Sequence, residues 1–244
     1  MLTIKNVSAV IDTTEVLSDV NLKVNKGEVH VIMGPKESGK SSLVHMIQGN
    51  PYMLITEGSI TFNGKNITKK SPDKRSQLGI FTSFQTPPEI AGLTNLEATK
   101  IIYENNKEIV FTSALELCYK NLIRELELGG TFTNEFVNDD DRLPSDWRKS
   151  EILQMLMINP NLAMLDEIDL EQDDHSLELI ANTILSFMKE PEKACIIVTN
   201  NQKFLDLLNP THVHVVVEGR IATQGGPELY KRIIEDGYSQ FSES

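Results

Sequence analysis

A short apolar run that leads into two closely spaced glycines constrains this chain more than any other feature. Residues 27–43 read GEVHVIMGPKESGKSSL, and the segment from Gly34 to Ser41 matches the pattern G-x-x-x-x-G-K-[ST]. The apolar residues before Gly34 predict a buried strand, and SSLVHMIQG after it predicts a helix. In this context the glycines let the chain turn tightly, so that successive backbone N–H groups converge on phosphate oxygens. The sequence therefore predicts a phosphate-binding loop.

The loop residues have distinct expected roles. Lys40 is placed to reach the β- and γ-phosphates of a nucleotide, and the Ser41 hydroxyl is placed to coordinate Mg²⁺. The N-terminal end of the following helix adds a positive dipole. The residues expected to bind ATP are Gly34, Pro35, Lys36, Glu37, Ser38, Gly39, Lys40, Ser41 and Ser42.

A second apolar strand, LAMLDE, ends in two carboxylates, Asp166 and Glu167. Asp166 is suited to the Mg²⁺ shell, and Glu167 is suited to orient or polarise the attacking water. A strand that ends in acids is also a common way to leave a sheet without any function. The phosphate loop upstream favours the functional interpretation.

Composition limits the classes of protein that this chain can belong to. It has 244 residues, of which 40% are hydrophobic and 24% are charged, as expected of a globular protein, and its formal net charge is −12. Such an acidic balance argues against a nucleic-acid partner or an anionic membrane surface. No apolar run is long enough to cross a bilayer, and the N-terminus lacks the pattern of a signal peptide, so we expect a cytoplasmic protein without membrane insertion.

The order of the predicted elements indicates an α/β fold. Residues 2–24 alternate loosely and are rich in β-branched residues, which predicts antiparallel strands. Residues 58–67 and 79–85 read as further strands, and residues 95–129 read as mostly helical. From residue 149 onward, helices alternate with the strands LAMLDE, ACIIVTN and HVHVVVEG, and a terminal helix follows residue 227. This alternation predicts a mostly parallel sheet with crossover helices.

Four stretches together resemble the ABC-type ATPases, and within that superfamily the SufC group, the ATPases of the SufBCD iron–sulfur cluster assembly system. They are GEVHVIMGPKESGKSSL, GIFTSFQTPPEI, SEILQMLMINPNLAMLDEID and VTNNQKFLDLLNPTHVHVVVEGRIATQGG. The resemblance implies a P-loop NTPase fold in a single domain, 1–244, with an N-terminal antiparallel β-subdomain and an inserted helical subdomain at about 90–158. It also implies partners of the SufB/SufD type and an ABC-type dimer with itself or a paralogue.

The resemblance also assigns residue roles. Gln85 would contact Mg²⁺ and the attacking water, so the expected metal ligands are Ser41, Gln85 and Asp166. The catalytic positions would be Glu167, Gln85 and the switch position, Asn200. The cofactors would be ATP and Mg²⁺.

The chain departs from the family where a second subunit's site should be completed. Leu143, Pro144, Ser145 and Asp146 stand at the positions of the L-S-G-G-E/Q signature. Leu143 has no hydroxyl, proline has no N–H to donate, and Asp146 adds an anion close to the expected phosphate. The switch histidine is replaced by Asn200, and the loop carries Lys36 and Glu37 in place of asparagine and glycine. We therefore predict nucleotide binding with slow or absent hydrolysis by a homodimer.

Other interpretations remain open from the sequence. The chain could be a non-catalytic nucleotide-binding subunit that pairs with a signature-bearing paralogue, or the ATPase subunit of an ABC transporter. His212 and His214 share one face of a strand, a spacing compatible with metal binding. Because no carboxylate or cysteine is near them in sequence, we favour a structural role, and we interpret His30 as a packing residue.

Overall fold

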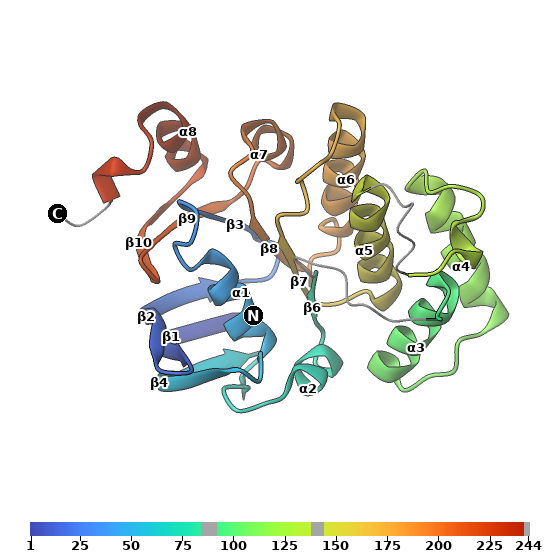
Figure 1. Ribbon diagram of the computed structural model, residues 1–244, viewed down its shortest axis with the longest axis horizontal. Coiled ribbons are helices and arrows are strands. Elements are labelled where there is room, and N and C mark those ends of the chain that lie inside the picture. Colours follow the sequence, from blue (N-terminus) through green and yellow to red (C-terminus); the bar gives the residue numbers. More distant parts are fainter. Residues whose placement is uncertain (84–91, 138–143, 242–244) are drawn as a thin grey trace.

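The computed structural model describes residues 1–83, 92–137 and 144–241 of the chain (Figure 1). Two sheets form its centre. The smaller, antiparallel sheet has the order β2-β1-β4-β5. Its strands are β1 (Leu2–Ile11), β2 (Thr14–Val24), β4 (Met53–Phe62) and β5 (Lys65–Asn66). The β-branched N-terminal segment thus forms the expected antiparallel pair, which turns at residues 12–13.

The larger sheet has the order β10-β9-β3-β8-β7-β6. It consists of β3 (Val29–Met33), β6 (Ile80–Thr82), β7 (Leu162–Asp166), β8 (Ala194–Val198), β9 (His212–Val217) and β10 (Arg220–Gly225). The pairs from β9 to β6 are parallel, and the β10–β9 pair is antiparallel. The carboxyl ends of β3, β7 and β8 therefore meet at one edge of the sheet, where ligands bind in open α/β folds.

Helices surround the larger sheet. Helix α1 (Lys40–Gln48) follows β3 and lies between the two sheets, whereas α3, α4 and α5 form the part of the molecule on the right of Figure 1. The other helices are α2 (Pro72–Gln77), α3 (Asn95–Lys107), α4 (Ser113–Glu125), α5 (Pro144–Ile158), α6 (Asp174–Phe187), α7 (Gln202–Leu208) and α8 (Pro227–Asp236). Two short 3₁₀ turns occur at Phe132–Asn134 and Ser239–Phe241.

The alternation of side chains along β3 shows how the larger sheet is buried on both faces. Val29, Val31 and Met33 join the core beneath the helices, whereas Ile32 joins the core against α1 and the smaller sheet. The strand is buried throughout because a parallel strand covered on both sides has no solvent face. This packing fixes the position at which the chain leaves β3 and enters the loop.

A buried arginine holds the far end of α1. The Arg75 guanidinium donates to the carbonyls of Met46 and Ile47 at 2.8 Å each, and to those of Lys70 and Thr68. Carbonyls at a helix C-terminus have no partner within the helix, so this side chain supplies the missing donors. It ties α1 to the segment that leads to α2.

Two boundaries and one strand differ from those expected from the sequence. Strand β4 begins at Met53 rather than at Gly58, because it pairs along nearly all of β1. Strand β10 was not predicted, since its residues alternate polar and half-buried on an edge strand. Helix α5 begins at Pro144, so the altered signature residues Ser145 and Asp146 lie in its first turn. Gln85 and Leu143 lie outside the described residues.

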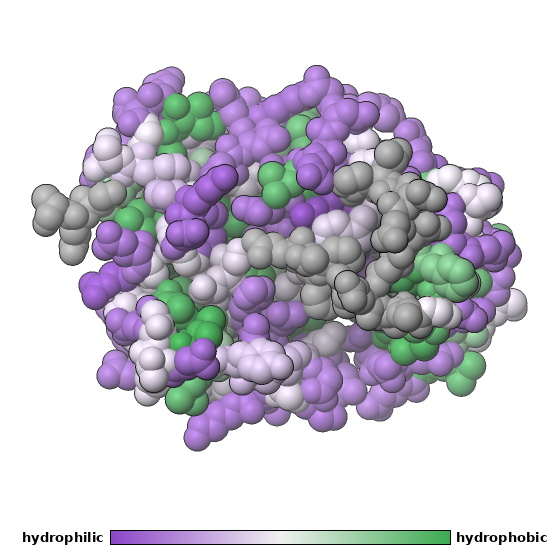
Figure 2. Space-filling view, in the orientation of Figure 1, coloured by the Kyte–Doolittle hydropathy of each residue, from purple (hydrophilic) through white to green (hydrophobic). Residues whose placement is uncertain are grey.

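The face shown in Figure 2 is largely hydrophilic, with separate hydrophobic patches between the polar side chains. Among the described helices, none combines the length and the apolar character needed to cross a membrane.

Candidate functional site

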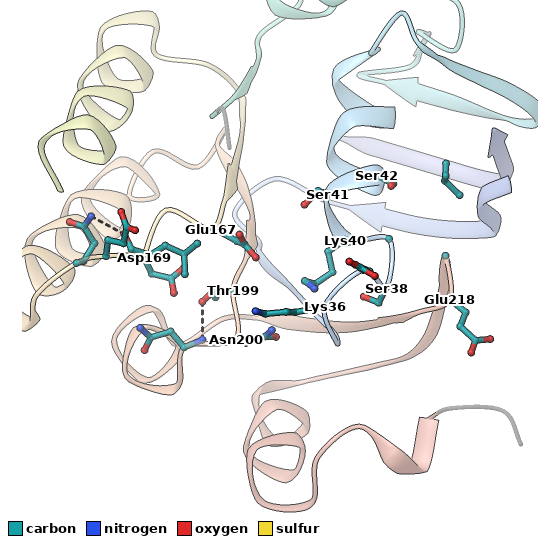
Figure 3. Close-up of a pocket in the computed structure, with 18 of the residues that line it drawn as sticks. Lys36, Ser38, Lys40, Ser41, Ser42, Glu167, Asp169, Thr199, Asn200 and Glu218 are labelled. Carbon is teal, nitrogen blue, oxygen red and sulfur yellow. Dashed lines mark hydrogen bonds between the residues drawn. The ribbon is translucent and has the colours of Figure 1, made fainter. Parts of the chain in front are cut away.

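The predicted phosphate loop opens onto a cavity of about 1210 Å³ at the carboxyl edge of the larger sheet (Figure 3). Four other segments line the cavity together with the loop, from β2, from the residues after β7 and β8, and from the turn between β9 and β10. The lining residues are Glu15, Val16, Lys36 to Ser42, Glu167, Asp169 to Gln172, Thr199 to Asn201, Glu218 and Gly219. Figure 3 shows Lys40 and Ser38 on one side of the cavity, with Glu167 and Asp169 on another.

Both loop glycines are required by the geometry. A Cβ atom on Gly34 would lie 2.2 Å from the carbonyl oxygen of Val216, so only glycine fits where β3 passes β9. Gly39 has φ of 103° and comes directly before α1, in a conformation that side chains disfavour. The tight turn predicted from the motif is therefore present, and it places the first backbone N–H groups of α1 at the cavity.

Lys40 is buried and folded back onto its own loop. Its ammonium donates to the carbonyl of Pro35 at 2.6 Å and to that of Gly34 at 3.1 Å. Burial lowers the pKa of Lys40, while the nearby Glu167 and Asp166 carboxylates act in the opposite direction. A phosphate entering the loop would exchange these carbonyl contacts for a full negative charge, which is a stronger acceptor.

Carboxylates outnumber basic groups around the cavity. Among the described lining residues there are two lysines, Lys36 and Lys40, and six acids, namely Glu15, Glu37, Glu167, Asp169, Glu171 and Glu218. A polyphosphate without a counter-ion would be repelled by this set. A divalent cation bound with the phosphates would reverse the local balance.

Asp166 has the environment of a cation ligand. It ends β7 with 1% of its surface exposed, and neither carboxylate oxygen receives a hydrogen bond of ordinary geometry from a described residue. Burial raises the pKa of Asp166 to about 6; the Ser41 hydroxyl and the Lys40 ammonium nearby only partly oppose this. An orphaned buried carboxylate beside a serine hydroxyl fits Mg²⁺, which prefers oxygen ligands.

Glu167 and Asp169 extend this acidic edge. Glu167 adopts a left-handed conformation with φ of 52° and donates its N–H to the carbonyl of Val198, so its side chain leaves β7 toward the cavity. Burial also raises the pKa of Asp169, against the effect of the Thr199 hydroxyl. Thus the residue expected to orient water is located at the cavity, beside the residue expected to hold the cation.

Asn200, at the switch position, clamps the phosphate loop. Its amide nitrogen donates to the carbonyl of Gly34 at 3.1 Å, and its amide oxygen accepts from the Gly34 N–H at 3.3 Å. The same oxygen accepts from the Tyr238 hydroxyl at 2.7 Å. No sequence pattern points to Tyr238, because it lies in the C-terminal segment, 38 positions from Asn200.

The first turns of α5 carry an unusual set of side chains in place of the signature. The Arg148 guanidinium lies 4.1 Å from the centre of the Trp147 ring and contacts Glu151 at 3.4 Å. Arg148 and Glu151 are both buried. Charge and aromatic surface therefore occupy the start of α5, where the sequence resemblance leads us to expect the signature.

Comparison with known proteins identifies the family. A family model described as "ABC transporter" matches residues 17–169, which include the phosphate loop and the strand ending in Asp166. The chain belongs to this family. ABC ATPases of this family bind ATP, so the cavity lies where the family's nucleotide is expected.

Curated relatives match along nearly the whole chain. "Probable ATP-dependent transporter ycf16" of Cyanophora paradoxa is 36% identical, covering 100% of this chain and 95% of the relative. "Vegetative protein 296" of Bacillus subtilis is 35% identical, covering 97% and 91%. "Iron-sulfur cluster assembly protein SufC" of Plasmodium berghei is 36% identical, covering 94% of this chain and 64% of the relative.

Solved cassettes confirm the fold. A dimeric cassette, MJ0796, in a post-hydrolysis state with ADP and Pi has a TM-score of 0.81 at 20% identity, covering 93% of this chain and 99% of that one. The ADP conformation of the cassette MJ1267 has a TM-score of 0.78 at 26% identity, covering 97% and 95%. The predicted P-loop NTPase fold of the ABC type is thus confirmed, as is the similarity to SufC-type proteins.

Proposed function

We propose that this chain binds ATP and ADP with Mg²⁺ in the cavity described above. The loop from Gly34 to Ser42 would hold the phosphates, and Lys40 would leave its carbonyl partners for the β- and γ-phosphates. Ser41 and Asp166 would hold Mg²⁺, together with Gln85, which lies outside the described residues. The observation that carries this proposal is the buried carboxylate of Asp166, which lies beside Ser41 and Lys40 and receives no hydrogen bond of ordinary geometry from a described residue.

Mg²⁺ would neutralise charge that builds up on the phosphates, and the chain's own residues would position the reactants. Glu167 would accept a proton from, or orient, the attacking water. Asn200 is an amide, so it cannot carry the positive charge of a histidine at this position. Its present bonds to Gly34 instead support the loop, so the γ-phosphate would lose one charged contact.

We further propose that hydrolysis by a homodimer is slow or absent. In an ABC-type dimer, the phosphate loop of one subunit faces the signature of the other. This chain's signature positions offer fewer hydrogen-bond donors to the γ-phosphate, and Asp146 adds a negative charge. Removing one preorganised hydrogen-bond donor that stabilises the transition state typically lowers the rate by about 10²-fold or more.

The biological role that we propose is iron–sulfur cluster assembly with partners of the SufB/SufD type. The support is the similarity along the chain to the Plasmodium berghei protein named for that process, at 36% identity. In this role the chain would act in the cytoplasm as an ATPase or as an attenuated one. A test is co-elution of the purified chain with purified SufB-like and SufD-like proteins on a sizing column.

Two alternatives have specific support. The altered signature favours a non-catalytic nucleotide-binding subunit that pairs with a signature-bearing paralogue. Several relatives are named probable ATP-dependent transporters, which favours an ATPase subunit of a membrane transporter. If phosphate is released only after the chain is mixed with a signature-bearing paralogue, the first alternative is supported. If the chain associates with a membrane-spanning protein, the second is supported.

Isothermal titration with Mg-ATP and Mg-ADP tests the binding proposal directly. We expect saturable binding that weakens at least tenfold in Lys40→Ala and also when EDTA replaces Mg²⁺. Lys65→Ala is the matched control, because Lys65 is exposed on β5 and outside the cavity. Absence of binding, or equal loss in both lysine variants, would contradict the proposal.

A further inference from the structure

Three histidines and a glutamate converge at the opposite end of the larger sheet from the nucleotide cavity. His30 of β3 is the direct register partner of His212 on the neighbouring parallel strand β9, and Ile32 pairs with His214. Residues two apart on a strand share a face, so His30, His212 and His214 all point to the same side. The strands lie side by side in Figure 1.

Glu28 completes this group. One carboxylate oxygen of Glu28 and one ring nitrogen each of His30 and His212 lie within 4.8 Å of one another. Glu28 Oε2 is 2.9 Å from His30 Nε2. From the sequence alone we favour a structural role for His212 and His214, because we expect no carboxylate near them. In the fold, Glu28, which directly precedes β3 and lies 184 positions from His212 in sequence, brings a carboxylate close to His212 and His30.

We propose that Glu28, His30 and His212 form a site for a divalent first-row transition-metal ion, such as Zn²⁺. Two imidazoles and one carboxylate form a known ligand set for Zn²⁺ and for Fe²⁺. In a tetrahedral shell with bonds of about 2.0–2.1 Å, the donors stand about 3.3 Å apart. Glu28 Oε2 and His30 Nε2, which are 2.9 Å apart, would separate slightly to admit the ion. The His212 ring stacks on the His30 ring, with centroids 4.4 Å apart and an interplanar angle of 11°, so it would turn out of this stack to direct a nitrogen lone pair at the same ion. Water would complete the shell.

The hydrogen bonds around His212 leave the correct nitrogen available. The Thr211 hydroxyl donates its one proton to the Val29 carbonyl at 2.9 Å and accepts from the Val29 N–H at 3.0 Å. With the hydroxyl proton on the Val29 carbonyl, His212 Nδ1, at 3.0 Å from the same oxygen, is the donor in this contact. A neutral His212 then carries its lone pair on Nε2, which is the nitrogen offered to a metal.

His30 is oriented in a similar way by a group behind it. Its Nδ1 lies 2.8 Å from Nε2 of His214, and both rings are buried and nearly coplanar, with an interplanar angle of 10°. With a metal on Nε2, the neutral His30 ring carries its proton on Nδ1 and donates it to His214. Metal-binding histidines are commonly held by such an outer hydrogen bond.

The carboxylate is also held in place and remains accessible. Glu28 accepts from the Asn25 N–H at 2.6 Å and from the Asn25 amide at 2.8 Å. Its side chain is 20% exposed, whereas that of His30 is 1% exposed, so an ion would enter from the Glu28 and His212 side. Gly34 lies four residues along β3 from His30, or roughly 13 Å, so this site is separate from the nucleotide cavity.

Zinc titration of the untagged full chain tests this proposal. After removal of metals with EDTA and gel filtration, we expect isothermal titration with Zn²⁺ to give one site per chain. His212→Gln and Glu28→Gln should each weaken Zn²⁺ binding at least tenfold, and Thr211→Val by about tenfold through loss of the outer hydrogen bond. Cobalt substitution should give the intense visible bands of a four-coordinate ion in the wild-type protein, and these should be lost in His212→Gln.

Matched controls separate this site from other histidines and from the nucleotide site. His175→Gln removes an exposed histidine that contacts Glu127, outside the cluster, and should leave Zn²⁺ affinity unchanged. His212→Gln should leave Mg-ATP affinity and circular dichroism unchanged, which shows that the variant is folded. The proposal is overturned if wild type and His212→Gln bind Zn²⁺ equally, or if His175→Gln abolishes binding.

Discussion

At the residue scale, Asp166 is held with its charge in an unfavourable environment. Burial raises its pKa to about 6, from an ordinary value of 3.8. Below about pH 4 the folded and unfolded states both carry the proton. Between pH 4 and 6 the unfolded state releases it first, so stability falls as pH rises through this window and stays lower above it.

Asp166→Asn therefore tests the strain at this position. Without nucleotide or metal, we expect the variant to be more stable than wild type by roughly 3 kcal/mol at pH 7.5, since each pKa unit corresponds to about 1.4 kcal/mol. The difference should vanish below about pH 4. Urea unfolding at several pH values measures it, and a variant that is less stable than wild type at pH 7.5 would contradict this account of Asp166.

The affinity of the Asp166→Asn variant for nucleotide should no longer depend on Mg²⁺. An amide is a poorer ligand for Mg²⁺ than a carboxylate. In this account the charged Asp166 carboxylate lowers the free energy of unfolding of the ligand-free protein and also supplies a ligand for the cation. Binding of Mg-nucleotide should offset this loss in the free energy of unfolding.

At the element scale, the junction of β3 with α1 depends on a close approach between strands. Gly34→Ala would place a methyl group 2.2 Å from the Val216 carbonyl, so either β9 or the loop must move. We expect a loss of about 1–3 kcal/mol in the free energy of unfolding and weaker nucleotide binding.

Gly129→Ala serves as the matched control for this substitution. A Cβ atom there would meet no heavy atom within 4 Å. Its effect on stability should stay within about 0.5 kcal/mol. If the two alanine variants unfold at the same denaturant concentration, the close approach of β9 to Gly34 is not what requires glycine.

Helix α5 carries the second prediction at this scale. Replacing Leu143, Pro144 and Ser145 together with Ser, Gly and Gly restores the donors of the family signature. We expect phosphate release by the homodimer to increase by about 10²-fold or more, because each preorganised donor acts on the transition state. An unchanged rate, with nucleotide still bound, would mean that the signature positions do not limit turnover.

Some parts of the site could be predicted from the sequence, and others could not. The phosphate loop and the strand ending in Asp166 were predictable because their functional residues are contiguous in sequence. The clamp between Asn200 and Gly34 was not, since the two residues are 166 positions apart and neither type is unusual alone. Likewise, the pairing of His30 with His214 depends on the register of β3 and β9, which no local pattern encodes.

At the scale of the whole molecule, β3 connects two chemically different regions. Its carboxyl end enters the phosphate loop, and its amino end carries Glu28 and His30. The cavity lined by the phosphate loop lies at the carboxyl edge of the larger sheet. The domain boundaries, a single domain over 1–244 with a helical subdomain near 90–158, remain a prediction.

The central claim is that this chain retains the parts that bind Mg-nucleotide within one subunit and lacks the parts that complete a neighbour's site. Steady-state phosphate release from purified protein with saturating Mg-ATP tests it most directly, beside Lys40→Ala as the background. We predict a rate close to that background. Turnover well above Lys40→Ala would contradict the claim, because the altered signature and Asn200 would then support hydrolysis.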